Sequence, residues 1–132
     1  MKNYQRGQTI LEVLIALAVA GFILTAIAAT MVITLNNAQF VKQKAQALHY
    51  LEEGIENVRI SRDTSSDWNT FVLAHTTPQQ ENLDGGTFTR ITTVTVGAPP
   101  NDDRVTGVVT VSWSDVKGTH QVISTTILGQ WE

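Results

Sequence analysis

The sequence predicts an α+β protein in which a long N-terminal helix packs on a small antiparallel β-sheet. Three observations indicate this fold class. Residues 13–35 form an apolar run without a charge. Residues 36–62 repeat apolar side chains with helical spacing and contain no proline. Residues 87–128 then hold three segments rich in Val, Ile and Thr, which favour β-strands.

Length and composition limit what the protein can be. The chain has 132 residues, a formal net charge of -3 and no cysteine. No disulfide stabilises it, and no thiolate can act as a ligand or nucleophile. The acidic balance argues against nucleic acid as the main partner. We divide the sequence into a leader (1–7), a long helix (8–62) and a β-rich head (63–132).

The apolar run predicts a single membrane-spanning helix at about residues 13–35. A helix of that length rises roughly 34 Å, which is enough to cross the hydrocarbon core of a bilayer. Lys2 and Arg6 precede it and favour a cytoplasmic N-terminus, with the head outside. Glu12, directly before the run, is the one charged residue between Arg6 and Lys42.

Two interpretations of the apolar run require no partner protein. The first is a cleaved secretory signal, because Ala18-Val19-Ala20 has the small residues of a cleavage site. The length of the run opposes it, since the apolar part of such a signal is usually about 7–15 residues. The second is a plain membrane anchor with Glu12 near the interface.

The N-terminal segment resembles that of type IV pilins and the related pseudopilins. The residues that match are a short basic leader ending in Gly7, then Gln8-Thr9-Ile10-Leu11-Glu12, then the apolar helix. The resemblance implies that a prepilin peptidase cuts after Gly7 and that the new N-terminal residue, Gln8, is N-methylated. It also implies an α+β fold and assembly with other pilin-like subunits into a pilus or secretion filament.

A physical argument for Glu12 stands beside the resemblance. Cleavage after Gly7 would leave a free amine on Gln8, and Glu12 follows it by one helical turn, about 6 Å along the axis. The carboxylate of one subunit could therefore pair with the amine of a neighbour shifted by a similar rise. A partner offsets much of the cost of burying a charge in the membrane, so Glu12 is the predicted assembly contact.

Two departures from the family favour a minor pilin or pseudopilin over a major pilin. Gln8 stands where major pilins usually carry Phe or Met, and no proline occurs from Ile10 to His75. The alternative function is a single-pass membrane-anchored binding module that does not polymerise. The sequence leaves open whether the machine is a pilus, a type II secretion system or a DNA-uptake system.

The helix is expected to continue past the membrane, from about Gln8 to Ile60, with a break at Asn36-Asn37 as the alternative. Its apolar stripe should face the head. The stripe consists of residues that recur every seven positions, with two more between them: Val41, Leu48, Ile55, Leu51 and Val58. The charged residues Glu52, Glu53 and Glu56 are expected on the solvated face.

The head is expected to be a meander of three or four antiparallel strands. Residues 63–86 are rich in turn formers and are interpreted as a loop with room for one short element, fixed to the core by Trp68 and Phe71. Strands are expected at 87–96, 104–113 and 119–128, with a hairpin between the last two. The middle strand should place Val105, Val109, Val111 and Trp113 on one face.

No residue pattern predicts catalysis, and no cofactor or metal is expected. His49, His75 and His120 are isolated and are interpreted as surface or partner-contacting residues. Ser114, Asp115 and His120 suggest a hydrolase triad, but no nucleophile elbow accompanies them. Asn101-Asp102-Asp103 could bind calcium through loop oxygens, although an ordinary polar turn is the preferred interpretation.

Overall fold

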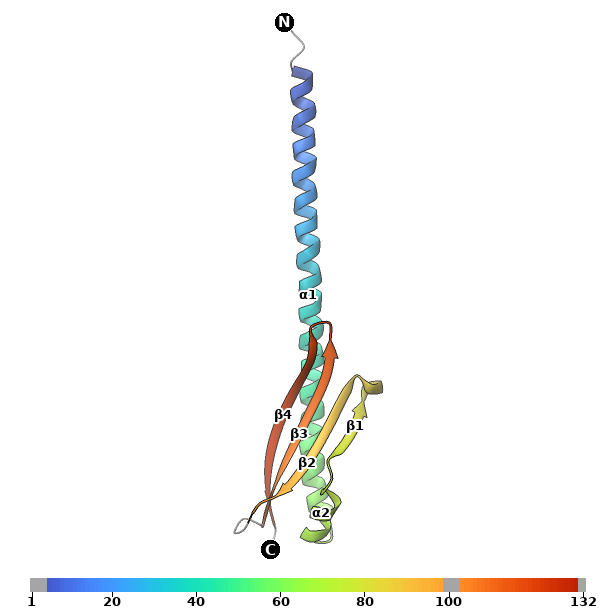
Figure 1. Ribbon diagram of the computed structural model, residues 1–132, viewed down its shortest axis with the longest axis vertical. Helices are drawn as coiled ribbons and strands as arrows, with labels where there is room; N and C mark the ends of the chain where they lie inside the picture. Colours follow the sequence, from blue (N-terminus) through green and yellow to red (C-terminus); the bar gives the residue numbers. More distant parts are fainter. Residues whose placement is uncertain (1–4, 99–102, 131–132) are drawn as a thin grey trace. The chain divides into compact units, whose positions relative to one another are not determined.

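The computed structural model of the chain describes residues 5–98 and 103–130, with side chains from residue 9 onward. Figure 1 shows the elements in chain order: helices α1 (Gln5–Thr64) and α2 (Trp68–Ala74), strand β1 (Gln79–Leu83), the short 3-10 turn η1 (Asp84–Gly86), and strands β2 (Phe88–Val96), β3 (Arg104–Asp115) and β4 (Gly118–Gly129). The α+β fold class is confirmed. Helix α1 has no break at Asn36-Asn37 and extends beyond both expected ends.

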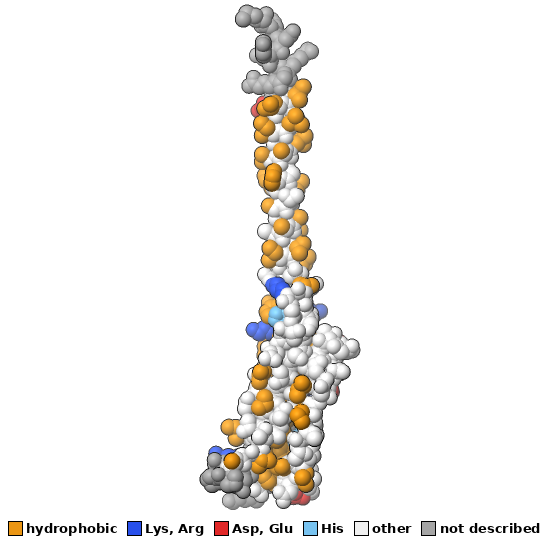
Figure 2. All heavy atoms as spheres, in the orientation of Figure 1, with side chains coloured by type: hydrophobic (Ala, Val, Ile, Leu, Met, Phe, Trp, Pro, Cys, Tyr) orange, Lys and Arg blue, Asp and Glu red, His pale blue; other side chains and the backbone are white. Residues whose placement is uncertain are grey.

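The chain divides into two units, Met1–Phe40 and Val41–Glu132. In the first unit, every described side chain from residue 9 to residue 35 is exposed. Figure 2 shows the resulting apolar surface along this part of α1. Among the described residues, α1 is the one helix that is long and apolar enough to cross a membrane.

The few hydroxyl groups in this apolar stretch bond to the helix itself. The Thr25 hydroxyl donates to the carbonyl of Phe22 at 2.8 Å, and the Thr30 hydroxyl donates to the carbonyl of Ile27 at 2.8 Å. The Thr34 hydroxyl donates to the carbonyl of Thr30 at 2.9 Å. Because each donor is satisfied within the helix, these residues can enter hydrocarbon without an unpaired polar group.

In the second unit, one row of α1 packs on the sheet. The row is Ala47, Leu51, Gly54 and Val58, all buried. The expected stripe was therefore right for Leu51 and Val58. It was wrong for two other residues, since Val41 is 64% exposed and Leu48 is 41% exposed. An α-helix turns by 100° per residue, so Val41, Leu48 and Ile55 lie about a quarter turn away from the buried row. They therefore lie at the edge of the contact with the sheet or outside it.

The sheet is an antiparallel meander in the order β1-β2-β3-β4. The three expected strands and the hairpin are confirmed. The predicted inner face of β3 is also confirmed, because Val105, Val109 and Val111 are fully buried and Trp113 is 3% exposed. Strand β1 lies in the segment expected to be a loop. Apart from Leu83 its residues are polar and exposed, so its side chains carry no strand pattern. Its pairing with β2 holds it in place.

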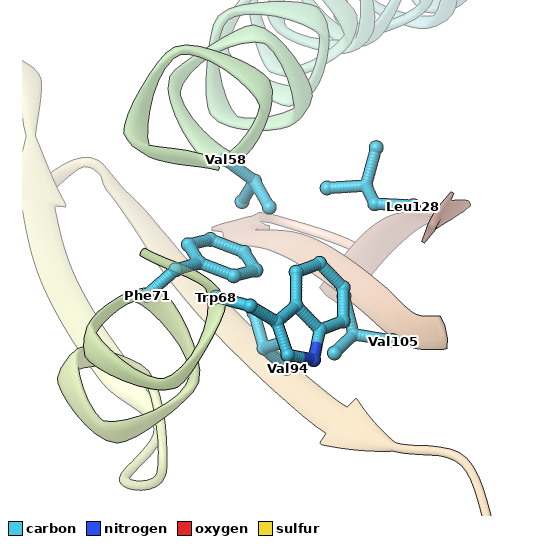
Figure 3. Packing of buried hydrophobic residues seen from close by; sticks show 6 residues of the cluster. All are labelled: Val58, Trp68, Phe71, Val94, Val105 and Leu128. Atoms are coloured by element: carbon cyan, nitrogen blue, oxygen red, sulfur yellow. The ribbon is translucent and has the colours of Figure 1, made fainter. Parts of the chain in front are cut away.

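The core lies between α1, α2 and one face of the sheet. Figure 3 shows its central cluster, which comprises Val58, Trp68, Phe71, Val94, Val105 and Leu128. Asp67 caps the N-terminus of α2, because its carboxylate accepts from the Thr70 N–H at 2.8 Å. This hydrogen bond holds the pKa of Asp67 below its ordinary value. The expectation that Trp68 and Phe71 fix this segment to the core is confirmed.

At Gly54, α1 approaches the sheet closely. A Cβ at this position would lie 2.8 Å from Val109 Cγ1 and 3.0 Å from Arg90 Cδ. Val109 is itself fully buried in the middle of β3 and has little room to move. The glycine therefore allows helix and sheet to meet, which outweighs its unfavourable helix propensity of about 1 kcal/mol relative to alanine.

We expect Gly54→Ala to destabilise the protein although alanine is the better helix former. The added methyl group overpacks the contact with Val109, an effect that typically costs about 1–3 kcal/mol. The measurement is denaturant unfolding of the chain in detergent, followed by tryptophan fluorescence. Glu52→Ala, at an exposed position of the same helix, is the control and should leave the midpoint nearly unchanged. A Gly54→Ala protein as stable as its parent would contradict the steric argument.

Candidate functional site

The predicted processing and assembly residues lie together at the start of α1. The backbone of Gly7 and Gln8 is helical, and their side chains lie outside the described residues. Glu12 follows Gln8 by one turn, and its side chain is exposed. Within the described part of the chain, no basic side chain forms an ion pair with Glu12.

The side chains around Glu12 are apolar. Its neighbours along the helix are exposed aliphatic side chains: Leu11 is 60% exposed, Val13 is 58% exposed and Ile15 is 56% exposed. In a membrane these side chains contact lipid, so Glu12 is a carboxylate at the edge of an apolar surface. Ionisable groups in such places are expensive and commonly pair with an opposite charge.

Comparison with family models finds the pattern that these residues form. Residues 2–28 match the model described as the prokaryotic N-terminal methylation motif. The chain carries the type IV pilin signal. The matched range includes Gly7, Gln8 and Glu12 together with most of the apolar run, and it ends before the head.

The matched motif supports a type IV pilin-like protein. It fits a membrane-anchored protein, and a minor pilin or pseudopilin is consistent with it. No curated protein and no solved structure matches the chain. The helix followed by an antiparallel sheet is the arrangement that the resemblance implies.

Arg90 is a residue of the head that sequence reasoning missed. Its side chain is buried on the inner face of β2, between the helix and the sheet. Its guanidinium donates to the backbone carbonyl of Tyr50 at 3.0 Å and to the Glu81 carboxylate at 2.6 Å, and it lies 3.5 Å from the Glu53 carboxylate. It thus joins α1, β1 and β2. The sequence did contain one signal: Arg90 is an even number of residues from Phe88 and Val94, so it shares the inward face of β2 with them.

The histidines differ from expectation at one position. His49 is exposed, as expected for a surface residue, but His75 is 8% exposed. The His75 Nδ1–H donates to the carbonyl of Phe71 at 2.9 Å, and the two rings lie 4.8 Å apart. The interpretation of His75 as a surface residue was wrong, because the ring closes the C-terminal end of α2. Within the described residues, no group of three side chains could hold a metal.

The suggested triad is not assembled. His120 Nε2 lies 2.9 Å from Asp115 Oδ1, and this hydrogen bond holds the pKa of Asp115 below its ordinary value. The Ser114 side chain lies on the opposite face of the sheet from Asp115 and His120, because successive side chains of a strand alternate between the faces. Its hydroxyl forms a hydrogen bond with the Thr119 hydroxyl. Asn101 and Asp102 of the candidate calcium loop lie outside the described residues.

We expect Arg90→Met to destabilise the head by about 1–3 kcal/mol. The substitution keeps much of the side-chain volume but removes the charged hydrogen bonds to Tyr50 and Glu81, and bonds of this kind contribute about 1.5–3 kcal/mol. Denaturant unfolding in detergent measures the change. Arg104→Met, at an exposed residue that pairs loosely with Asp103 at 3.9 Å, should shift stability by less than about 0.5 kcal/mol. Equal effects of the two substitutions would refute the bridging role of Arg90.

Proposed function

We propose that the chain is a structural subunit of a type IV pilus-like filament, a minor pilin or pseudopilin. It is processed after Gly7 by a prepilin peptidase and assembled through its N-terminal helix. The observation that carries this proposal is a single carboxylate, Glu12, placed within the methylation motif at the start of an exposed apolar helix. The chemistry of the chain is structural rather than enzymatic, and no cofactor takes part.

The proposed sequence of events follows from the order of residues along α1. The apolar run holds the subunit in the inner membrane as a single span, with the head outside. Cleavage after Gly7 exposes the amine of Gln8, and Glu12 of the next subunit pairs with it. Other pilin-like subunits then cover the apolar surface of α1, so the subunit leaves the lipid and enters the filament.

Three features favour a minor pilin or pseudopilin over a major one. Gln8 is polar where the resemblance leads us to expect Phe or Met, and α1 has no proline over its whole length. The head is also small, because it contains one four-stranded sheet and one short second helix. Such a subunit adds a distinct surface to a filament whose bulk is another chain.

The processing step is tested at Gly7. We expect the membrane-bound protein to begin at Gln8 and Gly7→Val to remain uncleaved, because a side chain at this position prevents close approach of the peptidase. Gel mobility and N-terminal sequencing report the cleavage. Membrane insertion should be unchanged, since residues 13–35 are the same. A wild-type chain that keeps Met1 in the membrane would instead support the anchored binding module.

The assembly step is tested at Glu12. We expect Glu12→Val to insert and to be cleaved normally, but to be depleted in filaments, because the neighbour's amine is left buried without a partner. Removing one member of a buried ion pair costs about 3–5 kcal/mol, and each 1.4 kcal/mol is tenfold in an association constant. The measurement is the ratio of this chain in sheared filaments to that in membranes.

Two variants define the specificity of that result. Glu12→Asp should be intermediate, since it keeps the charge but shortens the side chain. Glu52→Gln, which neutralises an exposed carboxylate elsewhere on α1, should enter filaments like the parent. If Glu12→Val enters filaments as well as the parent does, the carboxylate is not an assembly contact.

A further inference from the structure

The two edges of the sheet differ in length and in chemistry (Figure 1). Strand β1, at one edge, has 5 residues and includes the charged Glu81. Strand β4, at the other edge, has 12 residues and contains no proline, no acidic residue, no lysine and no arginine. Edge strands in natural proteins are usually kept from pairing with other chains by shortness, charge, proline or a bulge. Strand β1 follows this rule, whereas β4 does not.

The outer edge of β4, the side away from β3, is regular and open to a further strand. Residues of β4 and β3 are paired one to one from Gly118 with Asp115 to Gly129 with Arg104, so no bulge bends the strand away. The sheet order ends with β4, so none of the described strands pairs with its outer edge. The backbone N–H and C=O groups of a strand point alternately to its two sides. About half of those in β4 therefore point away from β3.

The outer face of the sheet, the side away from α1, presents aliphatic side chains next to this edge. Ile123 is 56% exposed and Ile127 is 67% exposed. Thr125 lies between them on the same face and is also exposed. A strand added beside β4 would place its own outward side chains against these three. Pairs of apolar or β-branched side chains across neighbouring strands stabilise a sheet, so the outer face favours an uncharged partner.

The inner face offers a second apolar surface, on the side of α1 nearer to β4. On one side of the buried row, the Tyr50 ring packs on Phe88 of β2, with ring centroids 5.4 Å apart. On the other side, Ile55 lines a hollow together with Ser124 of β4. Ile55 is half-buried, and Leu48, two turns earlier on the same side, is 41% exposed. The inward side chains of an added strand would cover these aliphatic groups.

We propose that the outer edge of β4 binds an uncharged, extended segment of another protein, which adds a further strand to the sheet. The backbone groups at this edge specify a strand, since an extended backbone presents N–H and C=O groups at matching intervals. The lack of charged residues in β4 and the aliphatic groups on both faces specify an uncharged segment with apolar side chains on both sides. In this mode of recognition, main-chain hydrogen bonds supply affinity and side chains supply specificity.

The edge strands of the chain itself are the competing occupants. Strand β1 of a second copy would cover 5 of the 12 residues of β4, and it carries the charged Glu81. A second copy of β4 is the other candidate, and sedimentation of the chain alone distinguishes it from another protein. Strand binding goes beyond the proposed function, because the edge lies wholly within the second unit and does not involve Glu12.

Binding is tested with a synthetic peptide that has the sequence of residues 105–114. This segment is uncharged and pairs with β4 through its other edge. The full chain is placed in nanodiscs, and fluorescence anisotropy of the labelled peptide reports binding above the background of empty nanodiscs. Two further peptides are N-methylated at alternate residues, one at the odd positions and the other at the even positions. We expect one of them to bind at least about tenfold more weakly and the other to bind like the parent peptide, because only one set of N–H groups faces β4.

The place of binding is tested by disulfide trapping, since the chain has no cysteine. The variant Thr125→Cys carries a thiol on the outer face of β4, and the peptides carry a cysteine at each position in turn. We expect trapping to be strongest at every second peptide position, because alternate side chains of a strand lie on the same face. Thr110→Cys is the matched control, on the same face of β3 and between β2 and β4. An added strand would lie two strands away, about 10 Å, which is beyond the reach of a disulfide.

Several results would overturn the proposal. No binding above empty nanodiscs would refute it, and if both methylated peptides bind like the parent peptide, backbone pairing does not hold them. If Thr110→Cys traps as much peptide as Thr125→Cys, the peptide only adheres to the outer face. If the chain sediments as a dimer without peptide and Thr125→Cys links two chains, a second copy occupies the edge instead. Glu12→Val should bind the peptide like the parent chain, so failure of the assembly test and failure of strand binding are distinguishable.

Discussion

The contact between α1 and the sheet is the interaction on which the head depends. The sheet has one apolar face, and its buried residues are covered by the row Ala47, Leu51, Gly54 and Val58 together with α2. With no cysteine, this small unit has no covalent cross-link to compensate for a missing helix. The close approach at Gly54 and the bridge made by Arg90 impose the same constraint. Both require a fixed distance between α1 and strands β2 and β3.

The helix therefore performs two unrelated tasks along its length. From residue 9 to residue 35 its side chains are exposed and mostly apolar, which suits lipid or the helices of other proteins. After Val41 one row is buried in the head while other faces remain in solvent. The change from one surface to the other occurs within a single uninterrupted helix, and Lys42 and Lys44 lie at the point of change.

The sequence predicted the elements with strong side-chain patterns and missed those held by the backbone or by a single polar residue. In β3, Val105, Val109, Val111 and Trp113 are spaced by even numbers of residues, so its inner face could be named in advance. Strand β1 could not, since Gln79–Leu83 has no apolar alternation and is defined by its pairing with β2. Val41 and Leu48 were misplaced because an apolar row does not by itself reveal which of two adjacent helix faces meets the sheet. At the candidate site, Gly7, Gln8 and Glu12 were named from the resemblance of the N-terminal segment to pilins, and their roles stay predictions. Arg90 needed its three-dimensional partners to be noticed.

The position of the boundary at Phe40 has a consequence for how such a protein can change over time or be re-engineered. A head cut off where α1 ends would lose the buried row and its core with it. A chimaera that joins this head to another anchor must therefore exchange the segment before Val41 and carry the rest of α1 along. Recombination is constrained in the same way. The part of α1 from Val41 onward packs on the sheet and has to be inherited with it, and only the part before Val41 can be exchanged.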